Sequence, residues 1–354
     1  MPNEILTGAI DELASGRDLS AQRTSEVLSE IMHGEASETQ IAGFLIALRT
    51  KGETVQELAG LARTMRELAV RVPIERQDLL DTAGTGGGRS SFNVSTTAAL
   101  IAAGAGCAVA KHGNRSATSR SGSADLLEAL GARIDLGPDV VATCIEEAGF
   151  GFIFAPAYHQ ATRYVIPVRR ELAVRTIFNM LGPLTNPAGA RRQLIGVADP
   201  AFLETMAGAL AVLGVERALL VAGEDGLDEV SASAPTRVVE LAGGELRAYS
   251  ITPEQLGVDP DSARGAEPSG GTPAENAAVT RAILAPGGVE GAPPPGLDLA
   301  LVNAGAAIYV GGRAQTIGEG VALAREVISD GRAAAALDRY VQVSKRLAPA
   351  EALR

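Results

Sequence analysis

The 354-residue chain has no tryptophan, only two cysteines, and few aromatic residues, which make up 3% of the sequence. Two cysteines, Cys107 and Cys144, cannot build the disulfide framework of a small secreted domain. So few aromatic rings argue against a site that depends on stacking. Lys and Arg number 31 against 42 acidic residues, and a net charge of −11 lacks the positive surface that nucleic acid or an anionic membrane attracts. An anionic ligand therefore needs a local cluster of positive groups.

Long hydrophobic runs are also absent. The longest uncharged apolar run, residues 98–110, contains glycines and falls short of the roughly 20 residues that span a bilayer. The N-terminus carries acidic residues where a secretory signal carries basic ones, so we expect a cytoplasmic protein with no membrane partner. The composition, 46% hydrophobic and 21% charged, is that of a folded chain, and its length predicts one large domain with a smaller one.

Residues 1–72 predict a small helical domain. Asn3, Ser20 and Ser37 each precede apolar residues at helical spacing, and Thr54 with Glu57 three positions later predicts a capping box. The short connections favour antiparallel neighbours. Because an all-helical unit of this size needs to bury one face elsewhere, we expect helices from about 163–182 to join it.

From residue 73 to the end, short apolar runs that stop at glycine alternate with helical patterns. This alternation predicts an α/β domain, residues 73–354, with a mostly parallel central sheet flanked by helices. The expected strands are 79–82, 107–110, 151–155, 194–198 and 218–222. A glycine pair within 237–251 predicts an antiparallel hairpin. The Pro- and Gly-rich stretches 257–273 and 286–295 are predicted to be exposed loops.

A first candidate site lies at residues 81–97, DTAGTGGGRSSFNVSTT. A strand that runs into four glycines and then into hydroxyl and amide residues before an apolar helix predicts an array of backbone N–H groups that binds an anion. The run matches neither standard nucleotide-binding pattern, GxxxxGK[ST] or GxGxxG. On the glycines alone, an ordinary tight turn with helix caps explains the segment equally well.

A second candidate lies at residues 109–130, where Lys111, Arg115 and Arg120 fall in a polar loop between a strand and a helix. If the sheet is parallel, this loop and the glycine loop meet at its carboxyl edge and could hold a polyphosphate. Arg120 is better explained as a solvated loop charge. His112 is either part of the site or a structural histidine, and we do not expect it to be a general base.

Two further candidates are weaker when taken alone. Asp228 and Glu229 follow an apolar strand and could hold Mg²⁺, although paired acids in loops more often face solvent. Arg169 and Arg170 lie in a predicted helix beside Glu171, where surface ion pairs explain both arginines.

Taken together and in order, these segments resemble the anthranilate phosphoribosyltransferase family, in the superfamily that also contains nucleoside phosphorylases. The resemblance runs from the N-terminal helices to Asn303. The motifs that carry it are GTGG at 84–87, SFNVST at 91–96, VAKHGNRS at 109–116, SGSADLLEALG at 121–131, RTIFNMLGPLTNP at 175–187 and GLDE at 226–229.

The resemblance implies an enzyme of tryptophan biosynthesis that moves the phosphoribosyl group of phosphoribosyl pyrophosphate to anthranilate. The residues it assigns to phosphoribosyl pyrophosphate are Gly84, Gly87, Gly88, Ser91, Asn93, Val94, Ser95, Thr96, Lys111, His112, Gly113, Asn114, Arg115, Ser116, Ala117, Thr118, Ser119 and Ser123. Those it assigns to anthranilate are Gly84, Asn114 and Arg169, and those it assigns to Mg²⁺ are Ser95, Asp228 and Glu229. It also implies a homodimer joined through the helical domain.

The chemistry of the reaction agrees with these residue types. Loss of pyrophosphate needs positive groups and N–H donors, whereas the neutral aromatic amine of anthranilate needs no strong base. We therefore expect no dedicated catalytic base, with His112 the residue that could assist a proton transfer. The nearest alternative, a pyrimidine nucleoside phosphorylase, is disfavoured by KHGNRS and by the Arg169 region. Net charge opposes a non-catalytic nucleic-acid-binding homologue.

One departure from the family pattern concerns the glycine loop. The family usually follows GTGG with an aspartate and a slightly longer spacer, whereas this chain has Gly88 and Arg89. The missing acid puts the strength of substrate and Mg²⁺ binding in question more than the type of reaction. Arg89 is expected either to compensate through a phosphate contact or to alter that strength.

Overall fold

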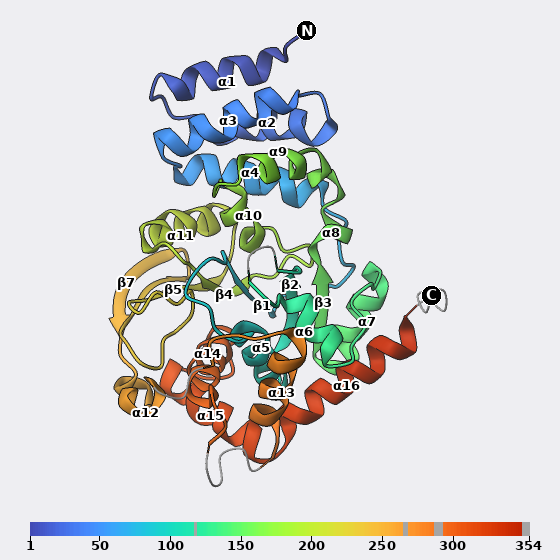
Figure 1. Ribbon diagram of the computed structural model, residues 1–354, viewed down its shortest axis with the longest axis vertical. Helices are drawn as coiled ribbons and strands as arrows, with labels where there is room; N and C mark the ends of the chain where they lie inside the picture. Colours follow the sequence, from blue (N-terminus) through green and yellow to red (C-terminus); the bar gives the residue numbers. More distant parts are fainter. Residues whose placement is uncertain (117–118, 265–267, 287–292, 349–354) are drawn as a thin grey trace.

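A computed structural model describes residues 1–116, 119–264, 268–286 and 293–348. The four predicted N-terminal helices are confirmed, and they form a bundle at one end of the molecule (Figure 1). They are α1 (Glu4–Ala14), α2 (Ala21–His33), α3 (Glu38–Lys51) and α4 (Val55–Leu68). The side chains of Asn3, Ser20, Ser37 and Thr54 accept backbone N–H groups of the first turns, and Glu57 completes the capping box.

A seven-stranded sheet forms the centre of the large domain, in the order β3-β2-β1-β4-β5-β6-β7. Neighbours from β3 to β5 pair in parallel, and β6 and β7 form the predicted antiparallel hairpin. The strands are β1 (Leu79–Gly84), β2 (Ala108–Gly113), β3 (Phe150–Phe154), β4 (Arg192–Gly196), β5 (Arg217–Gly223), β6 (Thr236–Ala242) and β7 (Glu245–Ile251). All five predicted parallel strands are therefore confirmed, with ends shifted by up to three residues.

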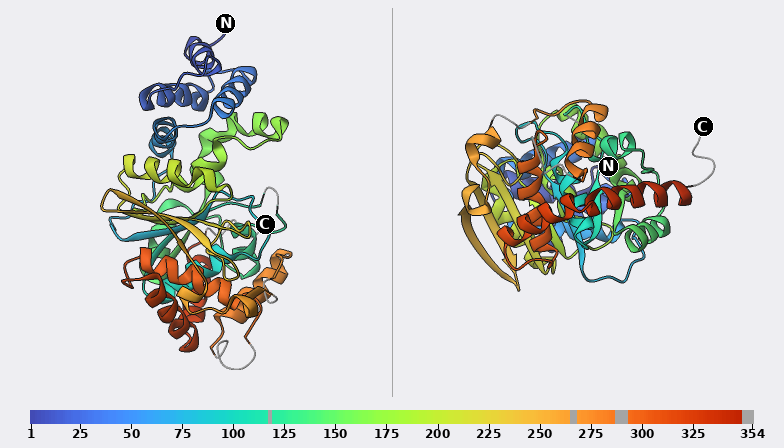
Figure 2. Two further views of the ribbon diagram at one scale, coloured as in Figure 1. Left: turned by 90° about the vertical axis from the view of Figure 1, so that its left-hand side faces the viewer. Right: turned by 90° about the horizontal axis from the view of Figure 1, so that it is seen from below.

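Helices cover both faces of this sheet, as the side view in Figure 2 shows. They are α5 (Val94–Gly104), α6 (Ser123–Ala129), α7 (Pro138–Ala148), α8 (Ala155–Tyr158), α9 (Ile166–Leu172), α10 (Phe178–Leu184), α11 (Leu203–Val212), α12 (Pro260–Arg264), α13 (Pro273–Leu284), α14 (Leu297–Val310), α15 (Ile317–Ser329) and α16 (Arg332–Leu347). Short 3₁₀ helices occupy Gln160–Tyr164, Pro200–Phe202 and Glu254–Leu256. Helix α12 corrects the expectation of a loop at 257–273, because Val258 and Ala263 are buried and anchor the segment.

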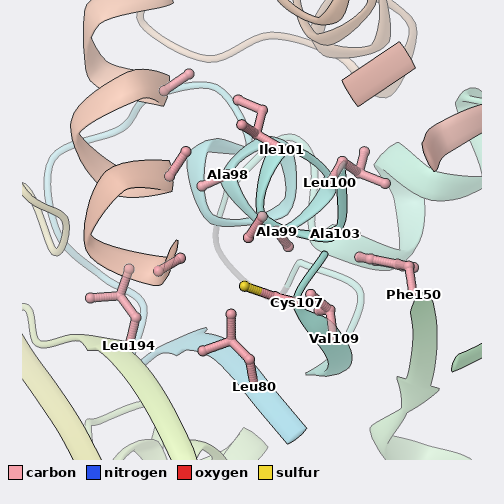
Figure 3. Packing of buried hydrophobic residues seen from close by; sticks show 14 of the residues in the cluster. Leu80, Ala98, Ala99, Leu100, Ile101, Ala103, Cys107, Val109, Phe150 and Leu194 are labelled. Atoms are coloured by element: carbon pink, nitrogen blue, oxygen red, sulfur yellow. The ribbon is translucent and has the colours of Figure 1, made fainter. Parts of the chain in front are cut away.

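The sheet separates two hydrophobic cores, and alternate residues of its strands face opposite sides. On β5, Leu219 and Val221 join a core with α5, α7 and α13–α16, while Leu220 joins a core with α10, α11 and the four-helix bundle. Figure 3 shows the first core, where Leu80 and Val109 lie beneath the alanine-rich face of α5. The bundle therefore has no separate core, since its apolar residues continue into the sheet through α4, α10 and α11.

The chain order of the strands reverses between β1 and β4. From β1 the chain adds β2 and β3 on one side, and it then returns to add β4 and β5 on the other. In open parallel sheets, ligands bind at such a reversal, outside the carboxyl ends of the strands. Gly84 of β1 and Gly196 of β4 pair at this point.

Candidate active site

The glycine loop that follows β1 lies at the strand reversal. Gly86 and Gly87 have φ values of +67° and +88°, a left-handed conformation that glycine adopts without strain. The N–H of Arg89 donates to the carbonyl of Gly226 at 2.7 Å, so the loop is joined to the segment that carries the acidic pair. The Arg89 guanidinium also pairs with the Asp225 carboxylate at 3.0 Å. Arg89, which stands near the position of the missing acid, is thus directed toward the acidic loop.

Asp228 lies directly over the ends of β1 and β4. A Cβ atom on Gly196 would overlap with the main-chain oxygen of Asp228, and one on Gly84 would lie 3.3 Å from its carboxylate. A Cβ on Gly88 would come within 2.5 Å of the same carboxylate. Three glycines therefore allow the acidic segment to pack onto the strand ends and the glycine loop, a close approach that side chains would prevent.

The two carboxyl groups share a buried environment. Burial raises the pKa of Asp228, while a hydrogen bond from the Gly86 N–H and the charge of Arg175 lower it. Burial and the neighbouring Asp228 charge raise the pKa of Glu229 to about 8, against the opposing effects of Lys111 and the Ser95 N–H. Two acids with raised pKa values, held by the glycine loop and by the N-terminus of α5, form an arrangement that a cation stabilises.

Lys111 belongs to β2 and is buried, so the prediction that it lies in a loop is wrong. Its ammonium donates to the main-chain oxygen of Thr82, to the Thr82 hydroxyl at 3.2 Å and to the Ser95 hydroxyl at 3.3 Å. Burial lowers its pKa to about 8, although the charges of Asp81 and Glu229 raise it. The lysine therefore supplies a positive charge from beneath the site.

The strands β1 and β2 separate beyond the pair Leu80 and Val109, and buried polar side chains fill the opening. Asp81 accepts the N–H of His112 at 3.1 Å and the amide of Asn186 at 2.7 Å. The same Asn186 nitrogen donates to the carbonyl of Ala110 at 2.8 Å. Since these bonds reach the residues on either side of Lys111, they fix the main chain that carries the ammonium.

The loop after β2 contains the remaining residues of the second motif. Arg115 does not face the glycine loop in this structure, because its guanidinium pairs with Asp125 at 2.8 Å and with Glu128 at 2.6 Å. The Ser123 hydroxyl donates to the carbonyl of Asn114 at 3.2 Å. The hydroxyl groups of Ser116 and Ser119 share a hydrogen bond of 2.6 Å. Ala117 and Thr118 lie outside the described residues.

The residues of the first motif occupy the start of α5. Asn93 is the N-cap residue, Val94 is buried, and Ser95 and Thr96 lie in the first turn. The amide oxygen of Asn93 accepts from the Ser121 hydroxyl at 3.0 Å and from Asn276 at 2.8 Å, so this side chain holds neighbouring segments together. Within the described chain, the buried Thr96 hydroxyl has no hydrogen-bond partner.

Arg169 and His112 both approach one helix, α10. The guanidinium of Arg169 lies 3.5 Å from the Asn179 amide oxygen and over the ring of Phe178, and burial lowers its pKa. The Nδ1 atom of His112 lies 3.2 Å from the carbonyl of Gly182. Positions 179 and 182 lie on the same side of a helix. Arg169 is thus partly buried against α10, which disagrees with a surface ion pair.

His112 has a histidine neighbour that the sequence did not single out. The rings of His112 and His159 lie 5.1 Å apart, and within the described residues the Nε2 atoms of both are buried without a partner. Burial lowers the pKa of His112 to about 3 and that of His159 to about 4. Both imidazoles are therefore neutral near pH 7. His159 lies 47 residues from His112 along the chain, so no sequence pattern points to it. Its place beside His112 is visible only in the folded structure.

Arg175 is a second residue that the sequence did not single out. Its guanidinium donates to the carbonyl of Gly87 at 2.7 Å, and its own carbonyl accepts from Arg49 of α3 at 2.7 Å. It therefore connects the four-helix bundle to the glycine loop. The sequence signal that could have identified Arg175 is its place as the first residue of the RTIFNMLGPLTNP motif.

The acidic pair fits a magnesium ion better than a transition metal. Where the structure describes the chain, no group of three or more His, Cys, Asp or Glu residues could enclose a metal. Mg²⁺ is typically held by one or two carboxylates together with water and substrate phosphates. Asp228, Glu229 and the Ser95 hydroxyl supply such a set.

Among the residues that the structure describes, no helix is both long and apolar enough to cross a membrane.

Known proteins resemble the chain along nearly its whole length. Residues 7–69 match the glycosyl transferase family, helical bundle domain, and residues 76–334 match the a/b domain of that family. The anthranilate phosphoribosyltransferase of Rubrobacter xylanophilus is 51% identical over 345 residues, covering 97% of this chain and 99% of that protein.

Two solved structures are similar in fold as well. The anthranilate phosphoribosyltransferase of Thermus thermophilus has a TM-score of 0.86 at 47% identity, covering 95% of this chain and 99% of that one. The Saccharomyces cerevisiae enzyme, solved in complex with PRPP and Mg, also has a TM-score of 0.86, at 28% identity, covering 97% of this chain and 98% of that one.

Proposed function

Because the chain belongs to the anthranilate phosphoribosyltransferase family of glycosyltransferases, we propose that the site at the strand reversal transfers a phosphoribosyl group to the amine of anthranilate. The products are N-(5-phosphoribosyl)anthranilate and pyrophosphate, in tryptophan biosynthesis. The observation that carries the proposal is the meeting of the glycine loop, the buried Lys111 and the acidic pair at one sheet edge.

Phosphoribosyl pyrophosphate is proposed to bind across the glycine loop and the start of α5. The exposed loop main chain and the N-terminus of α5 offer N–H groups to phosphate oxygens. Lys111 provides a fixed positive charge beneath them. As the bond from the ribose C1 to pyrophosphate breaks, negative charge grows on the leaving group, so groups that are already in place lower the barrier most.

Asp228, Glu229 and Ser95 are proposed to hold Mg²⁺, which neutralises pyrophosphate charge when it is bound. The carboxylates are kept in place by the Gly86 and Ser95 N–H groups, and Lys111 favours the ionised form of Glu229. In this chain, Arg89 and Asp225 join the acidic loop to the glycine loop. We propose that this ion pair partly compensates for the acid that is missing after GTGG.

Anthranilate is proposed to lie beside α10, with its carboxylate on Arg169. The arginine is partly buried, and its guanidinium is positioned by Asn179 and Phe178. The aromatic amine is neutral near pH 7 and needs positioning more than deprotonation. His112, with a pKa of about 3, is neutral and a weak base. We propose that the transfer uses no dedicated catalytic base.

The test of this function is the loss of anthranilate fluorescence when the protein is mixed with anthranilate, phosphoribosyl pyrophosphate and Mg²⁺. Arg169→Ala should raise the KM for anthranilate roughly 30-fold, because a charged hydrogen bond to the carboxylate contributes about 2 kcal/mol. Arg170→Ala is the matched control, since Arg170 is the exposed neighbour on the same helix. Wild-type protein that consumes no anthranilate would refute the proposed function. An unchanged KM in an active Arg169→Ala variant would refute the role of Arg169 in binding anthranilate.

Magnesium affinity should depend on pH through Glu229. Burial raises the pKa of this carboxyl to about 8, so below pH 8 a proton occupies the group that Mg²⁺ requires. The apparent Mg²⁺ association constant should therefore rise up to about tenfold per pH unit between pH 6 and pH 8, and then level off. Calorimetry in two buffers of different ionisation enthalpy would detect the released proton. Glu229→Gln should remove the dependence of the Mg²⁺ association constant on pH. If that dependence persists in the variant, the released proton comes from another group.

We also propose a cytoplasmic homodimer joined through the helical bundle. Ile46 on α3 and Ile166 on α9 keep 38% and 46% of their surface exposed, and these two helices pack together. An exposed apolar face on a small bundle favours association with a second copy.

A further inference from the structure

We infer that Asn303, which lies far from the acidic pair in the sequence, positions Asp228 and Glu229 by clamping the residue that follows them. The inference rests on the proposed function, because it concerns the carboxylates assigned to Mg²⁺. Asn303 lies on α14 and is completely buried. Its amide oxygen accepts the N–H of Val230 at 2.9 Å, and its amide nitrogen donates to the carbonyl of the same residue at 2.8 Å.

This pairing gives Val230 the two hydrogen bonds that a neighbouring strand would supply. The second hydrogen of the Asn303 amide is also used, in a bond of 2.8 Å to the carbonyl of Leu299. The amide is therefore satisfied in an apolar core, where an unpaired polar group would be costly. Asparagine is also a poorer helix former than leucine or alanine, which are frequent on α14. The hydrogen bonds to Val230 explain why position 303 of α14 carries a polar residue.

The acidic pair lies between two fixed points. On one side, the carbonyl of Leu227 accepts the N–H of Gly223 at 2.8 Å. On the other, Val230 is held by Asn303, and the next residue, Ser231, donates its N–H to the Thr236 hydroxyl at 2.9 Å. Asp228 and Glu229 are thus the two residues between these fixed points, and the C-terminal fixed point depends on α14. Without the amide, the main chain beyond Glu229 would lose both of its bonds to that helix.

Asn303 touches neither substrate nor metal in this arrangement, so it is a positioning residue. Residues that orient metal ligands typically change metal affinity by 10- to 100-fold when they are removed. We expect Asn303→Leu, which keeps the branched shape of the side chain and removes all three hydrogen bonds, to weaken Mg²⁺ binding by about tenfold in calorimetric titrations with pyrophosphate present. The KM for anthranilate should stay unchanged, because Arg169 lies on a different element.

Ser344→Ala is the matched control. Ser344 is also buried and accepts a main-chain N–H, that of Arg133 at 3.2 Å, but it lies on α16. This variant should lose thermal stability but keep wild-type Mg²⁺ affinity. If Asn303→Leu does not fold, Asn303→Asp decides the question, because it keeps the shape and the acceptor for Val230 but loses the amide donor; it should weaken Mg²⁺ binding several-fold.

Unchanged Mg²⁺ affinity in a folded Asn303 variant, with wild-type protein that binds Mg²⁺ and consumes anthranilate, would overturn the inference and leave the proposed function intact. Wild-type protein that neither binds Mg²⁺ nor consumes anthranilate would refute the proposed function itself. An equal loss of Mg²⁺ affinity in Ser344→Ala would also overturn the inference, because general destabilisation would then explain the effect.

Discussion

Gly196→Ala should lower kcat/KM for phosphoribosyl pyrophosphate by about 10²-fold while the protein still folds. The new methyl group would overlap with the main-chain oxygen of Asp228, so the acidic segment must move away from the strand ends. A displacement of about 1 Å at a catalytic group is enough for a loss of this size. Because Gly196 is the last residue of β4, the remaining pairs of the strand can stay in register.

The measurement is the rate of anthranilate fluorescence loss at several Mg²⁺ concentrations. Gly318→Ala is the control, since a Cβ on that glycine meets no atom closer than 3.9 Å. It should keep wild-type kinetics. A kcat/KM in Gly196→Ala within threefold of wild type would mean that the acidic segment can move without harm, and the close packing over β4 would then have no catalytic importance.

Lys111→Met should lower kcat by about 10²- to 10³-fold, as expected for the loss of a preorganised group that stabilises transition-state charge. The substitution keeps most of the side-chain volume and removes the positive charge beneath the pyrophosphate site. It should also raise the pKa of Asp81 and of Glu229, because the Lys111 charge lowers both in the wild type. The pH at which Mg²⁺ binding levels off should therefore move upward.

Lys51→Met separates this catalytic effect from a loss of stability. Lys51, whose side chain is mostly covered, pairs with Asp18 at 2.6 Å and with Glu57 at 2.9 Å in the helical bundle. Lys51→Met removes one partner of an ion pair, and Lys111→Met removes the donor to the buried Thr82, so both variants should melt at lower temperature. Only Lys111→Met should lose kcat at 25 °C. A kcat close to wild type in folded Lys111→Met would remove the lysine from the mechanism.

The elements that depend on local signals could be predicted from the sequence. The helix caps at Asn3, Ser20, Ser37 and Thr54 act within one helical turn, and the alternation of apolar runs with helices is enough to predict the parallel sheet. The glycine loop, the start of α5 and the acidic pair follow strands, so their meeting at one edge follows from parallel topology.

Features that depend on distant partners could not be predicted. Lys111 resembles a loop residue in sequence, yet β2 continues through it because β3 pairs with it at Phe152. Arg169 resembles a surface residue until α10 covers it. The pairing of Arg115 with Asp125 and Glu128 depends on how the loop after β2 folds back on α6. No pattern along the chain links Asn303 with Val230, which lies 73 residues away.

The shared core beneath the helical bundle has a consequence for how the protein is made. Helices α1–α4 are synthesised before the other elements of this chain, but the apolar residues that complete their core come from α10, α11 and β4–β6, the last of them Leu241. The bundle must therefore wait, with part of its apolar surface uncovered, until more than half of the chain has been synthesised. Exposed apolar surface of this kind makes a nascent chain prone to aggregation during that interval.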